Sequence, residues 1–182
     1  TSSNEPVPNY LEECRKKFKP VKIGLPKEFL DGLEDSVRKI FDDAVLILEK
    51  SGCHIKEISL KTSKLGVSAY QVVAPAECSS NLSRFDGVRF GHRAKDVSTI
   101  DELYKKSRSE GFGNEVKRRI LVGTYALSAG YYDAYYIKAQ KIRNVISQEF
   151  REAFDQVDLI LGPTTPDSAF KIGEKLDDPI AM

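Results

Sequence analysis

The stretch GFGNEVKRRILVGTYALSAGYYDAYYIKAQKIR, residues 111–143, carries the clearest pattern in this chain, and we expect the fold to be organised around it. It combines the adjacent arginines Arg118 and Arg119 with a run of small residues and five of the eight tyrosines. Apolar residues recur near helical spacing on both sides of Gly130, which predicts two consecutive helices. The predicted apolar positions are Val116, Ile120, Leu121, Tyr125 and Leu127 in the first helix, and Tyr132, Tyr135, Tyr136, Ala139 and Ile142 in the second.

Two questions about this stretch stay open at this point: what the small residues do, and whether the helices only form a core. The small residues 126–130 either allow another backbone to approach closely or end one helix before the next. A pair of core helices with a solvated basic edge accounts for the periodicity alone. A dense tyrosine cluster beside fixed cations is nevertheless unusual for residues that only fill a core.

Working outward, the N-terminal part predicts a βαβ unit. Residues 21–25 alternate apolar and polar ahead of a proline, and residues 53–60 predict a second strand. Between them lies a helix that Asp35 or Ser36 would cap and Gly52 would end. Its predicted buried stripe consists of Val37, Ile40, Phe41, Ala44, Val45 and Leu48. Such a unit implies two parallel strands joined by a right-handed crossover.

The remaining segments predict further helices and one more strand. Residues 65–82 indicate a helix broken or kinked near Pro75, residues 100–109 a short amphipathic helix, and residues 157–163 a buried strand with a turn. The second central helix is expected to continue to Phe154. We therefore predict an α/β fold, with residues 1–20 as a linker and residues 21–182 as part of one domain.

Composition excludes several classes of protein. The chain has 28 basic and 27 acidic residues, so its balance provides no general attraction to nucleic acid or anionic membranes. Three widely spaced cysteines form neither a disulfide framework nor a zinc motif, and they suit a reducing compartment. No apolar run approaches the length of a membrane span. Both ends of the sequence look like cuts in something longer.

Ligand-holding groups are better represented than catalytic ones. Neither His54 nor His92 lies in a recognised nucleophile or metal spacing, and no phosphate-binding loop or GxSxG motif is present. Residues 84–93 hold three arginines and His92, which suit an anion but more often form a salt-bridged edge. A helix-borne guanidinium suits bidentate capture of a carboxylate, although helical geometry alone leaves Arg118 and Arg119 equally good candidates.

Longer motifs carry a resemblance to a known family. The segments APAECSSNLSRFDGVRFGHR, SRSEGFGNEVKRRILVGTYALSAGYYDAYYIKAQKIR and LILGPTTPDSAFKIGEKLDDP are similar to the amidase signature family, and within it to the A subunit of glutamyl-tRNA(Gln)/aspartyl-tRNA(Asn) amidotransferases. The resemblance covers almost the whole chain. It implies an α/β fold with a mixed β-sheet covered by helices.

The resemblance also implies an activity and partners. Such a subunit hydrolyses free glutamine, and the ammonia passes to a B subunit that amidates misacylated tRNA with ATP and Mg²⁺. A C subunit stabilises the assembly. No cofactor or metal site is expected in this chain. The expected location is the bacterial cytoplasm, with an organellar homologue as an alternative, and the expected route is tRNA(Gln) or tRNA(Asn).

Residue by residue, the resemblance assigns two positions to glutamine. Arg119 corresponds to the arginine that binds the α-carboxylate of glutamine, and Tyr70 to a tyrosine of the same pocket. The Ser–Ser–Lys catalytic triad of the family has no counterpart in these residues, and the acidic residue for the α-amino group is expected just after Met182. Residues 1–182 alone are therefore expected to be inactive.

Two rival functions remain at this stage. One is a different amidase signature hydrolase, although an arginine that holds a carboxylate has no purpose for uncharged amides. The other is a non-catalytic binding or assembly module, which the missing triad favours for these residues taken alone.

Overall fold

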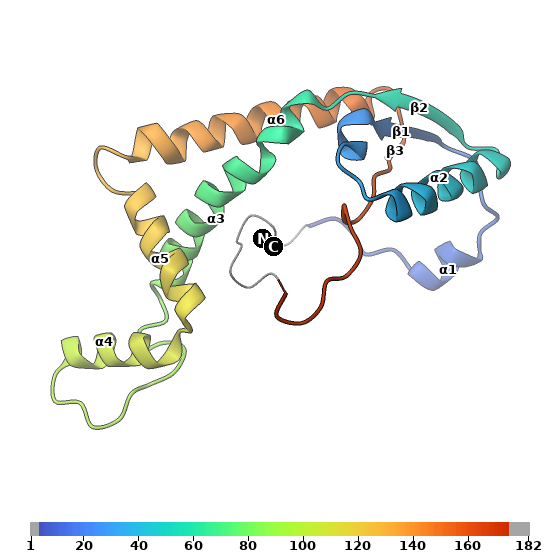
Figure 1. The fold of residues 1–182 in the computed structure, drawn as a ribbon. Helices are drawn as coiled ribbons and strands as arrows, with labels where there is room; N and C mark the ends of the chain where they lie inside the picture. The colour runs from blue at the N-terminus through green and yellow to red at the C-terminus, as the bar shows by residue number, and fades with distance from the viewer. Residues whose placement is uncertain (1–3, 175–182) are drawn as a thin grey trace. The chain divides into compact units, whose positions relative to one another are not determined.

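The computed structural model describes residues 4–174 (Figure 1). These residues form two compact units. The first contains the segment up to Ser59 and the segment from Ala153 onward, and the second contains Leu60–Glu152. We describe each unit by itself.

The first unit is built on a three-stranded sheet. Its strands are β1 (Lys22–Pro26), β2 (His54–Ile58) and β3 (Leu159–Ile160), in the order β2-β1-β3. Both neighbours run parallel to β1, with Ile23 opposite Ile55 on one side and Leu159 on the other. The predicted parallel βαβ unit is therefore confirmed. The third strand is shorter than predicted, and its Leu159 is half exposed rather than buried.

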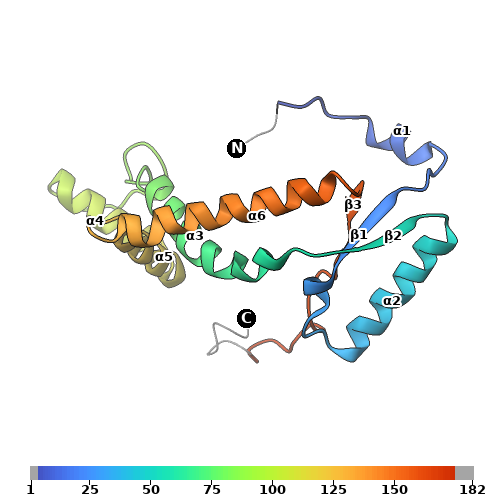
Figure 2. The same cartoon turned by 90° about the horizontal axis from the view of Figure 1, so that it is seen from above.

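Helix α2 (Asp35–Lys50) connects the first two strands and lies along the sheet (Figure 2). It ends before Gly52, whose φ of 92° is the left-handed conformation that glycine adopts most easily. The predicted cap is wrong, because Asp35 is already helical and the preceding Glu34 makes no side-chain cap. The Glu34 backbone N–H instead donates to the carbonyl of Pro166, which follows β3.

The buried stripe of α2 is narrower than predicted. Phe41 is buried, and Val37, Val45 and Leu48 are partly covered on the same side. Ile40 is 70% exposed, and Ala44 is exposed as well, so both were wrongly assigned to the core. Successive spacings of four, four and three residues define one line on a helix, and Ile40 and Ala44 lie off that line.

Two short helices complete the first unit. Helix α1 (Tyr10–Arg15) lies within the predicted linker, and Asn9 caps it by accepting a hydrogen bond from the Glu12 backbone N–H. None of its residues is buried. A 3₁₀ helix, Lys27–Leu30, follows β1 directly. The core of the unit centres on β1, where Ile23 and the neighbouring Ile58 and Val157 are almost fully buried.

Two neighbouring helices form the centre of the second unit. They are α3 (Gly66–Leu82), which follows a 3₁₀ turn at Lys61–Leu65, and α5 (Asn114–Ala126). Figure 1 shows them side by side. Helix α3 continues through Pro75, so of the predicted break or kink the break is wrong.

The close approach of these two helices occurs at Gly123 of α5. A Cβ atom at this position would lie 1.9 Å from the carbonyl oxygen of Pro75. Gly123 and Ala126 are buried, whereas the larger Leu121 and Tyr125 are 71% and 50% exposed, contrary to the predicted stripe. Small residues occupy this contact because larger side chains would keep the two helix backbones apart.

Helix α4 (Ile100–Gly111) is capped by Thr99, whose side chain accepts from the Glu102 backbone N–H. A hydrogen bond joins the preceding loop to this helix. The hydroxyl of Ser107, which is buried, accepts from the Ala94 N–H at 3.0 Å. Arg108 donates to the carbonyls of Leu82 and Phe85. The short amphipathic helix predicted here is confirmed.

The second predicted helix of the central stretch starts with a π-helical turn. Residues Tyr132–Ile137 form this turn and continue directly into α6 (Lys138–Phe154). Ala139 is buried as predicted, but Tyr132 and Tyr135 are 41% and 45% exposed. Helix α5 ends at Ala126. The interpretation that residues 126–130 end one helix before the next is therefore confirmed. Among the described residues, no helix is long and apolar enough to cross a membrane.

Candidate functional site: an arginine–tyrosine contact between two helices

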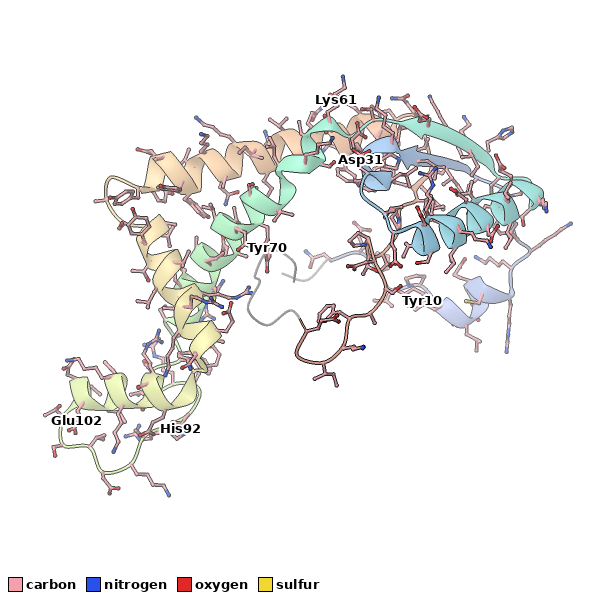
Figure 3. The ribbon with its side chains drawn as sticks, in the orientation of Figure 1. Tyr10, Asp31, Lys61, Tyr70, His92 and Glu102 are labelled. Carbon is pink, nitrogen blue, oxygen red and sulfur yellow. The ribbon has the colours of Figure 1, made fainter. Side chains whose placement is uncertain are left out.

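The structure brings the two predicted glutamine-binding residues together. Nη1 of Arg119, on α5, donates a hydrogen bond to the hydroxyl of Tyr70, on α3, at 3.2 Å. Figure 3 labels Tyr70 on its helix. The two residues are 49 positions apart in sequence, and the close α3–α5 packing at Gly123 places them within reach. Arg119 remains 44% exposed and Tyr70 52% exposed, so both are accessible to a ligand.

Glu115 holds the other edge of the same guanidinium. Its Oε1 accepts from Nε of Arg119 at 3.0 Å, one helical turn away. The hydrogen bond with Tyr70 and then that with Glu115 raise the pKa of Arg119 above its already high ordinary value. The guanidinium is therefore a permanent positive charge in this site.

Arg118 has a different environment. It donates through Nε and Nη2 to the second oxygen of Glu115, with the Nε bond at 2.8 Å. Its side chain is 67% exposed, against 44% for Arg119. The two arginines that helical geometry alone could not separate thus differ in that Arg119 contacts Tyr70 across the helix pair.

A second group of polar contacts lies on the same helix α3. Glu77 follows Tyr70 by two helical turns, and its Oε1 accepts from the hydroxyl of Tyr136 at 3.1 Å. Gln140 donates to the same hydroxyl at 2.9 Å. These contacts join α3 to the π-helical turn and to the beginning of α6. Sequence reasoning placed Tyr136 among the apolar positions of a helix and did not pair it with Glu77.

The exposed tyrosines stack where α5 meets the π-helical turn. The rings of Tyr125 and Tyr131 lie 4.2 Å apart between centroids, and Tyr135 lies within 6.2 Å of Tyr125. A hydrogen bond with Tyr131, together with partial burial, raises the pKa of Tyr125 to about 12. The Tyr125 phenol is consequently neutral at physiological pH.

Two of the cationic residues of the 84–93 loop, His92 and Arg93, have protein partners of their own. His92 pairs with Glu110 of α4 at 2.7 Å and lies beside that helix (Figure 3). Arg93 donates to the carbonyl of Gly87. The salt-bridged edge, which the sequence favoured over an anion site, agrees with these contacts. Within residues 4–174, no group of three histidine, cysteine or acidic side chains could hold a metal ion.

Comparison with known proteins places this geometry in context. The family model described as "Amidase" matches residues 1–182. The chain belongs to the amidase family. The resemblance of the quoted motifs to this family is therefore confirmed.

Curated relatives specify the resemblance further. The chain is 57% identical to the A subunit of glutamyl-tRNA(Gln) amidotransferase from Sulfurihydrogenibium sp. and 52% identical to that from Persephonella marina. A third relative, from Pseudomonas savastanoi pv. phaseolicola, carries the same name and is 56% identical. In all three cases the match covers 100% of this chain and 38% of the relative. The chain thus spans well under half the length of these relatives.

Solved structures confirm the α/β amidase fold. The crystal structure of the glutamyl-tRNA(Gln) amidotransferase A subunit from Thermotoga maritima superposes with a TM-score of 0.60 and is 38% identical, covering 88% of this chain and 30% of that one. A structure described as an amidase gives a TM-score of 0.62 at 24% identity, over 88% of this chain and 31% of that one. At that lower identity the likeness concerns the fold alone.

Glu115 is the site residue that sequence reasoning missed. The signal was available, because a glutamate four positions before an arginine on one helix forms an ion pair of ordinary geometry. The partner of Tyr136, by contrast, lies 59 positions away and required the fold.

Proposed function

We propose that residues 1–182 are the central-to-C-terminal portion of a glutaminase subunit of a tRNA-dependent amidotransferase. In this proposal the complete subunit hydrolyses glutamine and supplies ammonia for converting Glu-tRNA(Gln) to Gln-tRNA(Gln), or Asp-tRNA(Asn) to Asn-tRNA(Asn). The portion described here recognises glutamine. The catalytic Ser–Ser–Lys residues belong to other parts of the same protein.

The observation that carries the proposal is the contact between Arg119 and Tyr70. Amide hydrolases in general need no fixed cation, because a simple amide substrate carries no charge. Free glutamine carries a carboxylate, and a guanidinium forms two parallel charge-assisted hydrogen bonds with such a group. Identity above 50% to relatives that carry this name, over the whole chain, supports the same substrate class.

The remaining partners follow from the proposed role. Transfer of ammonia requires a B subunit that receives it, and a C subunit would stabilise the assembly. We assign ATP and Mg²⁺ to the B subunit, with no cofactor in this chain. Contact with misacylated tRNA is made mainly through the complex, which suits the balanced charge of the chain. The proposed location is the cytoplasm.

The rival functions are less well supported. A hydrolase of neutral amides gains nothing from the accessible Arg119. A non-catalytic module remains compatible with the residues described, because a ligand can be held without being cleaved.

The test uses the full-length protein in complex with its partners. Arg119→Lys is compared with the parent enzyme for amidation driven by glutamine and, separately, by an ammonium salt. Loss with glutamine but not with ammonium supports the proposal. Equal activity of variant and parent with glutamine would reject it.

A further inference from the structure

Glu115 contacts both arginines with different oxygens. Oε1 accepts from Nε of Arg119, while Oε2 accepts from Arg118. These two ion pairs lower the pKa of Glu115, with the bond from Arg118 as the largest cause. The carboxylate therefore stays ionised throughout the physiological pH range.

The contacts of Arg119 leave one edge of its guanidinium available. A guanidinium has five N–H donors, one on Nε and two on each terminal nitrogen. Glu115 takes the Nε donor, and Tyr70 takes one donor of Nη1. Nη1 therefore keeps one further donor and Nη2 keeps both, and these two nitrogens form the end-on edge of the guanidinium. That edge matches the two oxygens of a carboxylate.

The net charge of the cluster also favours a carboxylate ligand. One glutamate faces two arginines, so the three side chains together carry one excess positive charge. An incoming monoanionic carboxylate would neutralise it. Because Glu115 already takes the Nε donor of Arg119, the terminal nitrogens Nη1 and Nη2 are the ones left to donate to a ligand carboxylate.

We propose that Glu115 is a positioning residue for Arg119, which fixes the guanidinium so that its end-on edge receives the α-carboxylate of glutamine. This inference rests on the proposed function. Glu115 itself does not touch the substrate. It restricts rotation about the long side chain of Arg119, whose free rotamers would otherwise have to be ordered on binding.

Glu115 also lies in the first turn of α5, where an acidic residue stabilises a helix through its dipole. Asp101 holds the equivalent place in α4 and forms an i,i+4 ion pair with Lys105 at 2.6 Å. That ion pair lies on a different helix from the Arg119 cluster. Asp101→Asn therefore serves as a matched control for loss of a first-turn charge.

The experiment uses the full-length complex with Glu115→Gln, Glu115→Ala, Asp101→Asn and Arg119→Lys. Each variant is assayed with glutamine and with glutaminamide, which lacks the α-carboxylate. We expect Glu115→Ala to raise KM for glutamine about tenfold with little change in kcat, as for loss of a charged hydrogen bond. Glu115→Gln keeps one acceptor and is expected to give a smaller rise. The preference for glutamine over glutaminamide should fall in both variants.

The outcomes distinguish a failure of the positioning role from a failure of the proposed function. If Arg119→Lys loses its preference for glutamine but both Glu115 variants behave as Asp101→Asn does, the positioning role is wrong and the proposed function stands. If Arg119→Lys also keeps its preference, the proposed function fails. A Glu115 variant that loses activity equally on both substrates assigns Glu115 a merely structural role and overturns the inference. The isosteric Glu115→Gln provides this answer even if Glu115→Ala does not fold.

Discussion

Gly123 of α5 lies against the main-chain carbonyl of Pro75 in α3, so closely that a Cβ atom at position 123 would stand 1.9 Å from the carbonyl oxygen and 2.4 Å from the carbonyl carbon. Backbone atoms of a helix cannot move aside as a flexible side chain can. The contact therefore sets the separation of the two helices that carry Arg119 and Tyr70.

Gly123→Ala tests the importance of this contact for stability. The added methyl group has to push α3 and α5 apart, so we expect a loss of about 3 kcal/mol or more in the free energy of unfolding. Denaturant unfolding of the full-length protein measures it.

Gly66→Ala is the matched control. Gly66 is the first residue of α3, its φ and ψ are −59° and −47°, and a Cβ there meets nothing within 4 Å. Alanine is expected to stabilise this helical position by about 0.4–1 kcal/mol. Equal effects of the two substitutions would show that helix packing at Gly123 is not close.

Tyr70→Phe separates the hydroxyl of this residue from its ring. The hydroxyl accepts from Nη1 of Arg119, so its removal frees that donor and loosens the guanidinium. We expect a rise in KM for glutamine smaller than that of Arg119→Lys, with ammonium-dependent amidation unchanged. Steady-state kinetics with the two nitrogen sources measures both. An unaltered KM would mean that only the ring of Tyr70 matters.

The tyrosine cluster predicts a distinctive alkaline titration. Because its neutral form is favoured in the folded state, Tyr125 with a pKa of about 12 contributes stability below its ordinary pKa of 10.0, and that contribution is lost as pH rises through about 12. Ultraviolet absorbance of tyrosinate should show a late ionisation from Tyr125. Tyr125→Phe should remove it, whereas Tyr104→Phe, on the separate helix α4, should not. A late step that survives in Tyr125→Phe would contradict the assignment.

The secondary structure was largely predictable because most segments have strong local signals. The alternation in residues 21–25 and the left-handed Gly52 define the βαβ unit without tertiary information. The buried faces were predicted less well. Ile40 and Leu121 are apolar yet exposed, because the core contacts of α2 and α5 follow narrower lines than hydrophobicity alone indicates.

The candidate site was predictable in part. Residue types indicated an arginine on α5, and only the resemblance to a family distinguished Arg119 from Arg118. The contact with Tyr70 depends on helix packing at a glycine, which local sequence patterns do not report. Helical spacing alone could have predicted an ion pair for Glu115, because it lies three and four positions before the two arginines. Only the structure shows that it binds both of them.

The most direct measurement of the central claim is the kinetics of Arg119→Lys in the complete amidotransferase, with Arg118→Lys as the matched control. An ammonium group cannot reproduce the two parallel hydrogen bonds of a guanidinium, so we expect kcat/KM for glutamine to fall about tenfold or more. Arg118→Lys should do much less, and ammonium-dependent amidation should persist in both variants. Unchanged glutamine kinetics in Arg119→Lys, or equal damage with glutamine and ammonium, would contradict the assignment of Arg119 as the group that binds the α-carboxylate.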